Sequence, residues 1–235
     1  MQPRMTHWTP QALFAALTGA TLFATVVWSW HQPALTTIVL TLVLIAQLQY
    51  HPHPNDHRAM LAAALLGTPA EAVSVHLGEW TYHAPGLILG LPIWIPLIWA
   101  NLFALYRRLT RLLLAMLPAG NPFRVPYIRI LTILISVYAF LTLTLMDKMP
   151  LVHLLYAGFL IVMAGYWRAE TDLSIFVIGA LLGTLGEYTC VQLGYWHYYN
   201  PYFTSLGIDI TLAMDWGLSA VIIHRIAEFR PDTST

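Results

Sequence analysis

Three acidic side chains stand inside long apolar stretches of this sequence and are the residues best placed to do chemistry. They are Glu71, Glu187 and Asp215. An ionisable group at the centre of an apolar membrane helix costs about 2.5–3.5 kcal/mol or more, so it is kept for a function or a partner. A carboxylic acid held protonated in an apolar site can donate a proton to a substrate. The alternative is structural, with each carboxyl accepting hydrogen bonds that fix helix packing.

Glu71 and Glu187 occupy the same place in two copies of one motif. Residues 64–85 and 180–201 align with an offset of 116, and 12 of the 22 positions are identical. The shared pattern is Glu-x6-Gly-x-Trp-x-Tyr-x2-Pro. Identity at this level indicates an internal duplication.

The duplication singles out Asp215. After a one-residue insertion Trp99 aligns with Trp216, and Ile98 is the counterpart of Asp215. Repeat symmetry therefore does not demand a carboxylate at this position. The asymmetry favours Asp215 as the acid of a single working site, deep in the last apolar segment.

Aromatic residues accompany the carboxyl groups and are candidates for substrate binding. At a membrane interface such residues usually anchor helix ends. The alternative is a cavity lined by aromatic faces, which can hold a cation or stack on a flat polyene. The candidates are Trp80, Tyr82, Trp94, Trp99, Trp196, Tyr198 and Trp216.

The sequence predicts neither a metal nor a cofactor. Ten histidines are present, but His51, His53 and His57 fall in a proline-containing loop that is better explained as solvated. The Glu-x2-His pattern of di-iron bundles is absent from the sequence, as are nucleotide-binding glycine motifs.

Composition places these residues in a membrane protein. Hydrophobic residues make up 58% of the 235 positions and charged residues only 9%, against roughly 25% charged residues in a soluble domain. The net charge of zero gives no reason to expect nucleic acid. The expected partners are the lipid bilayer and an apolar small molecule.

We expect an all-α bundle of eight transmembrane helices, since about 20 apolar residues cross a membrane. Residues 1–118 and 119–235 would form two four-helix repeats, entering the membrane from the same side. Glu71 and Glu187 would then point towards the repeat interface at one depth. The expected spans are 11–30, 33–50, 59–79, 87–106, 127–146, 150–167, 172–194 and 204–224.

The basic residues predict the orientation. With eight spans, ten of the eleven Lys and Arg residues fall on one side, and only Lys148 falls on the other. The positive-inside rule then makes the protein a multi-pass protein of the cell (inner) membrane with both termini cytoplasmic. Pro92 and Pro96 are expected to kink the fourth span, and residues 107–117 to form an amphipathic segment on the membrane surface.

The segment Gly78-Glu-Trp-Thr-Tyr82, followed by Leu89-Gly-Leu-Pro-Ile-Trp94, resembles carotenoid hydratases and heterodimeric-type lycopene cyclase domains. These are small membrane enzymes of isoprenoid metabolism. The lycopene cyclase pattern has paired glutamates directly after the proline, where this chain has Ile93 and Trp94, which counts against that activity.

The chain is also similar in size to small membrane terpene cyclases, which rely on one Glu and one Asp in their helices. That resemblance implies roles for Glu71 and Asp215.

The leading hypothesis is an enzyme that protonates, cyclises or hydrates an isoprenoid or polyene lipid. In this hypothesis Asp215 is the acid, and Glu71 or Glu187 is its partner or the terminal base. The rivals are a proton-coupled transporter that uses the same carboxyl groups, and a non-catalytic membrane subunit.

Overall fold

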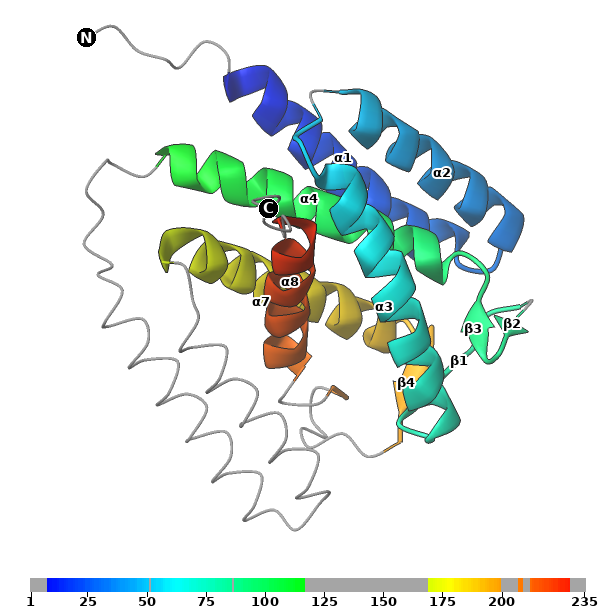
Figure 1. The fold of residues 1–235 in the computed structure, drawn as a ribbon. Coiled ribbons are helices and arrows are strands. Elements are labelled where there is room, and N and C mark those ends of the chain that lie inside the picture. The colour runs from blue at the N-terminus through cyan, green and yellow to red at the C-terminus, as the bar shows by residue number, and fades with distance from the viewer. Residues whose placement is uncertain are drawn as a thin grey trace, which may run out of the picture.

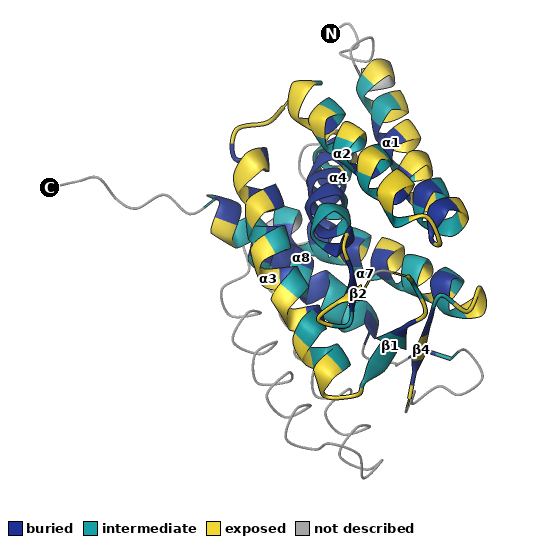
Figure 2. Ribbon diagram, turned by 90° about the vertical axis from the view of Figure 1, so that its right-hand side faces the viewer, coloured by how far each residue is buried: buried dark blue, intermediate teal, exposed yellow. Residues whose placement is uncertain are grey.

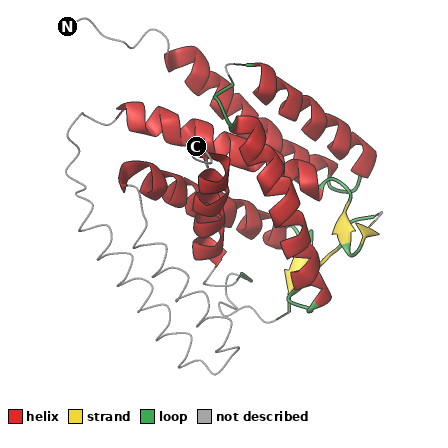
Figure 3. Cartoon of the chain, in the orientation of Figure 1, coloured by secondary structure: helices red, strands yellow, loops and turns green. Residues whose placement is uncertain are grey.

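The computed structural model describes residues 8–50, 52–85, 87–116, 169–199, 207–208 and 212–228, which form a mainly helical structure (Figure 1). The helices in these ranges are α1 Trp8–Ser29, α2 Pro33–Gln49, α3 Asp56–His76, α4 Ile95–Met116, α7 Ala169–Gln192 and α8 Leu212–Glu228. The short strands are β1 Trp80–Tyr82, β2 Leu87–Ile88, β3 Leu91–Pro92 and β4 Trp196–Tyr198 (Figure 3).

Three of these helices are long and apolar enough to cross a membrane. The spans are Pro10–Ser29, Asp56–His76 and Thr171–Gln192. Figure 2 shows exposed positions along these helices. Large apolar residues such as Leu17 and Leu181 are among the exposed ones, and so many exposed apolar groups suit contact with lipid. The helical fold expected from the sequence is confirmed, and the three helices are compatible with a membrane location.

The structure does not support the expected eight helices in two four-helix repeats. Within the described residues there are six helices, of which three qualify as spans. α4 carries three arginines in its second half, and α8 has only 17 residues. The expected spans 127–146 and 150–167 lie outside the described residues, as does the expected boundary at residues 118 and 119.

The expected fourth span, 87–106, was wrong at both ends. β2 and β3 form an antiparallel hairpin over residues 87–92, and α4 then runs from Ile95 to Met116. Pro92 lies in β3 and Pro96 in the first turn of α4, where proline removes no helical hydrogen bond, so the predicted kink has no basis. Residues 107–116 belong to α4 and do not form a separate surface segment.

α4 is the central helix of the described structure and packs against each of the other five helices. Ion pairs hold one end of this arrangement. Asp56 on α3 pairs with Arg107 at 3.0 Å and with Arg111 at 3.1 Å, and Arg225 on α8 pairs with Asp172 on α7. Asp172 stands 116 residues after Asp56, so the acid of these ion pairs holds the same place in both copies, although Arg225 aligns with Arg108 and not with Arg107.

Two glycines allow these helix pairs to approach closely. A Cβ atom at Gly67 on α3 would lie 2.1 Å from the Trp99 ring on α4. A Cβ atom at Gly183 on α7 would lie 2.2 Å from the Trp216 ring on α8. Because neither distance leaves room for a methyl group, glycine at both positions lets a tryptophan lie against the backbone of the facing helix.

Candidate functional site

Glu71 is held by two neutral donors. The Tyr82 hydroxyl donates to Oε2 at 2.6 Å, and the Trp99 indole donates from Nε1 to Oε1 at 2.9 Å. The residue is 9% exposed. Both carboxyl oxygens therefore accept a hydrogen bond inside the protein, from β1 on one side and α4 on the other.

Glu187 on α7 is held by the equivalent strand. The Trp196 indole donates to Oε2 at 2.8 Å and the Tyr198 hydroxyl donates to the same oxygen at 3.0 Å. Trp216 is a further hydrogen-bonding neighbour of this carboxyl. Glu187 is half-buried, and neither Trp196 nor Tyr198 uses its Oε1 atom.

The strands position these donors. β1 and β4 are antiparallel, with Trp80 opposite Tyr198 and Tyr82 opposite Trp196. The aromatic rings of both pairs have centroids 5.4 Å apart. Each strand therefore brings its tyrosine to its own glutamate while the aromatic rings pack on the other strand.

Glycines lead each helix into its strand. Gly78 has φ of 76° and Gly194 has φ of 75°. The left-handed conformation at these positions ends α3 and α7, and glycine adopts it without steric cost. The two Gly-x-Trp-x-Tyr motifs are thus helix stops followed by short strands, whereas the sequence placed the Trp and Tyr residues at helix ends.

Burial keeps the two tyrosines as donors. Burial, followed by the charges of the neighbouring glutamates, raises the pKa of the Tyr82 and Tyr198 hydroxyls well above 10. Both hydroxyls therefore keep their protons over the whole ordinary pH range. A protonated hydroxyl can donate to a carboxyl group through a full reaction cycle.

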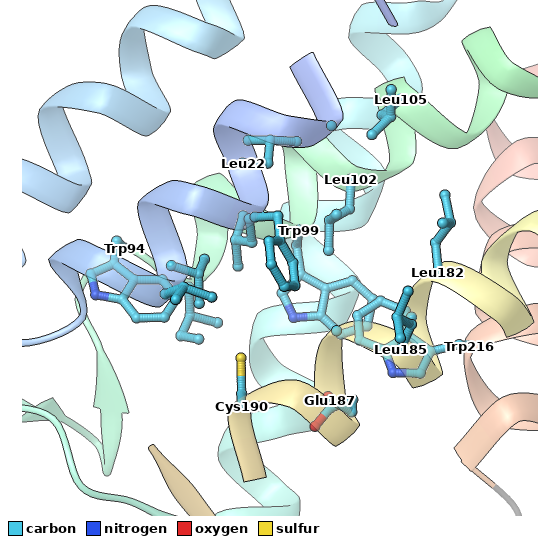
Figure 4. A pocket seen from close by; sticks show the side chains of 18 of the residues that line it. Leu22, Trp94, Trp99, Leu102, Leu105, Leu182, Leu185, Glu187, Cys190 and Trp216 are labelled. Atoms are coloured by element: carbon cyan, nitrogen blue, oxygen red, sulfur yellow. The ribbon is translucent and has the colours of Figure 1, made fainter. Parts of the chain in front are cut away.

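The two glutamates line one cavity of about 380 Å³ (Figure 4), a volume within the range of small-molecule sites. Its walls are mainly aliphatic and aromatic side chains of α1, α4 and α7. Trp99 and Trp216 stack along it with centroids 5.0 Å apart and an interplanar angle of 19°. The cavity thus combines two carboxyl groups with apolar walls and aromatic faces.

Most of the predicted aromatic residues reach this cavity. Tyr82, Trp94, Trp99, Trp196 and Trp216 line it. Tyr198 contacts it only through Glu187, and Trp80 packs on Tyr198 away from the lining.

Asp215, the predicted acid, does not line the cavity. It lies in the first turn of the described α8. Its neighbour Trp216 lines the cavity in its place. Residues 209–211, directly before α8, lie outside the described residues, so the predicted depth of Asp215 in the last span stays a prediction.

Sequence reasoning missed the buried residues that complete the site. Trp30 stacks on Tyr195 at 4.9 Å and packs edge-on against Trp94 at 5.2 Å, supporting one wall. Cys190, the lone cysteine, lines the cavity one turn beyond Glu187. A tryptophan at the end of an apolar segment and a single cysteine carry no pattern that could have assigned them to a site.

Within the described residues, neither Glu71 nor Glu187 belongs to an ion pair, since their partners are Tyr and Trp donors. A carboxyl group without a cationic partner can exchange protons without breaking an ion pair. The arrangement can therefore carry acid–base chemistry on an apolar ligand.

Comparison with known proteins gives no guide to that ligand, because the chain matches no protein-family model, no curated protein and no solved structure.

Proposed function

We propose that this protein is a multi-pass membrane enzyme that protonates an isoprenoid or polyene lipid and so isomerises, cyclises or hydrates it. The observation that carries this proposal is the cavity in which Glu71 and Glu187 face apolar and aromatic walls. The similarity of residues 78–94 to carotenoid hydratases supports the choice of an isoprenoid as substrate.

In the proposed mechanism Glu187 is the acid and Glu71 the base. Trp196 and Tyr198 both donate to Oε2 of Glu187, so the mechanism places the acidic proton on Oε1. Both oxygens of Glu71 accept hydrogen bonds, an arrangement suited to a carboxylate.

The step balances without a cofactor. Glu187 gives its proton to a carbon–carbon double bond, which leaves a carboxylate and a carbocation on the substrate. The faces of Trp99 and Trp216 stabilise the cation. Glu71 then removes a proton from an adjacent carbon to form a new double bond, and return of that proton to Glu187 restores the starting state. For hydration, water adds to the cation before the proton is lost.

The proposal includes the finer membrane architecture expected from the sequence: eight spans in two parallel repeats, in the inner membrane, with both termini cytoplasmic. Equivalent contacts support the duplication, since Gly67–Trp99 and Gly183–Trp216 pack alike. The bias of basic residues to one side supports the orientation.

The test is a lipid comparison in a host that makes polyene isoprenoids, with and without the gene. We expect a new or missing polyene product that depends on Glu187 and Glu71, so that Glu187→Gln and Glu71→Gln each abolish the change. Glu79→Gln is the matched control, because Glu79 directly follows Gly78 and does not line the cavity.

Asp215→Asn separates this mechanism from the one expected from the sequence. We expect this variant to keep the conversion, since Asp215 does not line the cavity. Loss of conversion in Asp215→Asn with retention in Glu187→Gln would assign the acid to Asp215. An unchanged lipid profile with the wild-type gene would contradict the proposed enzyme.

A further inference from the structure

We propose that the cavity opens to the membrane hydrocarbon between α1 and α7 and takes up the isoprenoid chain of a bilayer-dissolved lipid through that opening. The inference rests on the proposed function and deepens it by naming the route and the physical form of the substrate.

The first observation is that several residues that line the cavity are also exposed on the outer surface of the protein. Phe23 on α1 is 46% exposed and Leu185 on α7 is 57% exposed, and both line the cavity. Ala20 on α1 and Leu182 on α7 are likewise exposed lining residues. The same helix faces that wall the cavity therefore reach the surface, and among the described lining residues the exposed ones lie on α1 and α7.

The second observation identifies what lies outside the opening. α1 and α7 are two of the three helices that can span a membrane. The exposed lining residues fall well inside the spans Pro10–Ser29 and Thr171–Gln192. An opening at that level meets lipid chains, because no water is available there to fill it. The occupant is then a hydrocarbon chain and not a water-soluble solute.

The third observation concerns the two glycines of α7 near the opening. Gly183 packs against Trp216, which explains its lack of a side chain. Gly186 has no such contact, since a Cβ atom built there meets no atom of the described residues within 4 Å. Gly186 nevertheless lines the cavity. Glycine lowers helix stability relative to alanine, so its place here is explained by the open space that it leaves for a ligand.

The repeat supplies the comparison. The counterpart of Gly186 in the first copy is Ala70, which is exposed and does not line the cavity. A side chain is thus tolerated at the equivalent position where there is no opening. On α1, Ala16 is exposed one turn before Ala20 and also stands outside the lining.

These positions define the experiment. The full-length protein is placed in phosphatidylcholine vesicles that contain all-trans-retinol, an isoprenoid that accepts excitation energy from tryptophans such as Trp99 and Trp216. The signal from bound retinol is the part of the energy transfer that saturates as retinol is added. Excess phytol, a non-absorbing isoprenoid, displaces the bound retinol and removes this part of the signal.

We expect wild-type protein to show this saturable transfer. Gly186→Leu should weaken retinol binding at least tenfold, with Gly186→Ala intermediate, while Ala70→Leu binds normally. Ala20→Leu should slow uptake severalfold and Ala16→Leu should not. Circular dichroism of each variant checks that its helices are intact.

Two results would overturn the proposal: no saturable transfer in wild-type protein, or equal binding and uptake in Gly186→Leu, Ala20→Leu and their controls. Because binding is measured without turnover, the outcome is independent of the catalytic test. Glu187→Gln that binds retinol but converts no lipid would support both proposals. Glu187→Gln that still converts lipid would remove the mechanism and leave the opening in place.

Discussion

Each cavity glutamate depends on a tyrosine that follows it by 11 residues. Tyr198 and Tyr82 donate to Glu187 and Glu71 from paired strands, so the motif is a carboxyl group together with its own donor. A hydrogen bond to a charged group contributes about 1.5–3 kcal/mol. The donors therefore matter to the protonation of the carboxyl groups as well as to packing.

Tyr198→Phe tests this dependence. Tyr198→Phe removes one of the two donors to Oε2 of Glu187. We expect the rate of lipid conversion to fall roughly tenfold, which corresponds to an increase of about 1.4 kcal/mol in the activation free energy. The pKa of Tyr198 is raised by burial and by Glu187, so the wild-type rate should show no break where free tyrosine ionises. Rates of product formation in membranes measure both effects.

The control for that variant is Tyr199→Phe, because Tyr199 is an exposed neighbour of Tyr198. A rate in Tyr198→Phe equal to that of Tyr199→Phe would mean that the hydrogen bond serves packing alone.

At this scale the sequence predicted the two glutamates and most aromatic partners because the duplication repeats them. It could not show that Asp215 lies outside the cavity lining, since hydropathy does not report which residues line a cavity. Nor could it find Cys190, which lines the cavity, or Trp30, which packs against the lining residue Trp94, because only tertiary packing brings them there.

The elements of the structure are joined where tryptophans lie against glycines. Gly67→Ala and Gly183→Ala should each destabilise the protein by about 1–3 kcal/mol, because the added methyl group overpacks the helix crossing. Gly186→Ala should be neutral or slightly stabilising, because the space around it is open. Thermal unfolding in detergent, followed by circular dichroism, measures all three.

A melting temperature of Gly183→Ala equal to or higher than that of Gly186→Ala would contradict this prediction. That result would mean that Trp216 can move aside at no cost.

Sequence patterns gave the apolar helices α1, α2, α3 and α7 to within a few residues, because uniform apolarity marks their length. They failed for α4. Its first predicted residues form the β2–β3 hairpin, and its Arg107 side chain is buried in ion pairs that only the fold creates. Hydropathy counts Arg107 as a surface residue, whereas Asp56 and Glu228 on other helices make its burial possible.

At the scale of the whole molecule, a charge network ties α3, α4 and α8 together. Arg107 reaches Asp56 and, at 2.7 Å, Glu228 at the end of α8. Partial burial alone would raise the pKa of Glu228, but the hydrogen bond from Arg107 and its positive charge hold that pKa below the ordinary 4.5.

This lowered pKa predicts an acid-sensitive stability. Glu228 contributes its stabilisation fully above pH 4.5, and the contribution is lost as the pH falls through its lower folded-state pKa. Glu228→Gln should therefore lower the melting temperature at pH 7 and narrow its difference from wild type on acidification. Melting curves in detergent from pH 7 to pH 3 test this, and a constant difference would remove Glu228 from the network.

The pairing of β1 with β4 has a consequence for how such a molecule could arise. Thr81 lies opposite His197, its counterpart in the second copy, and the partners on either side exchange in the same way. The register is therefore self-complementary: two identical chains carrying only the first copy could form the same ladder as an isologous dimer. Joining two copies in one chain keeps that strand pairing and allows the sequence of each copy to change independently. After such divergence both oxygens of Glu71 accept a hydrogen bond, whereas both donors to Glu187 share its Oε2 atom.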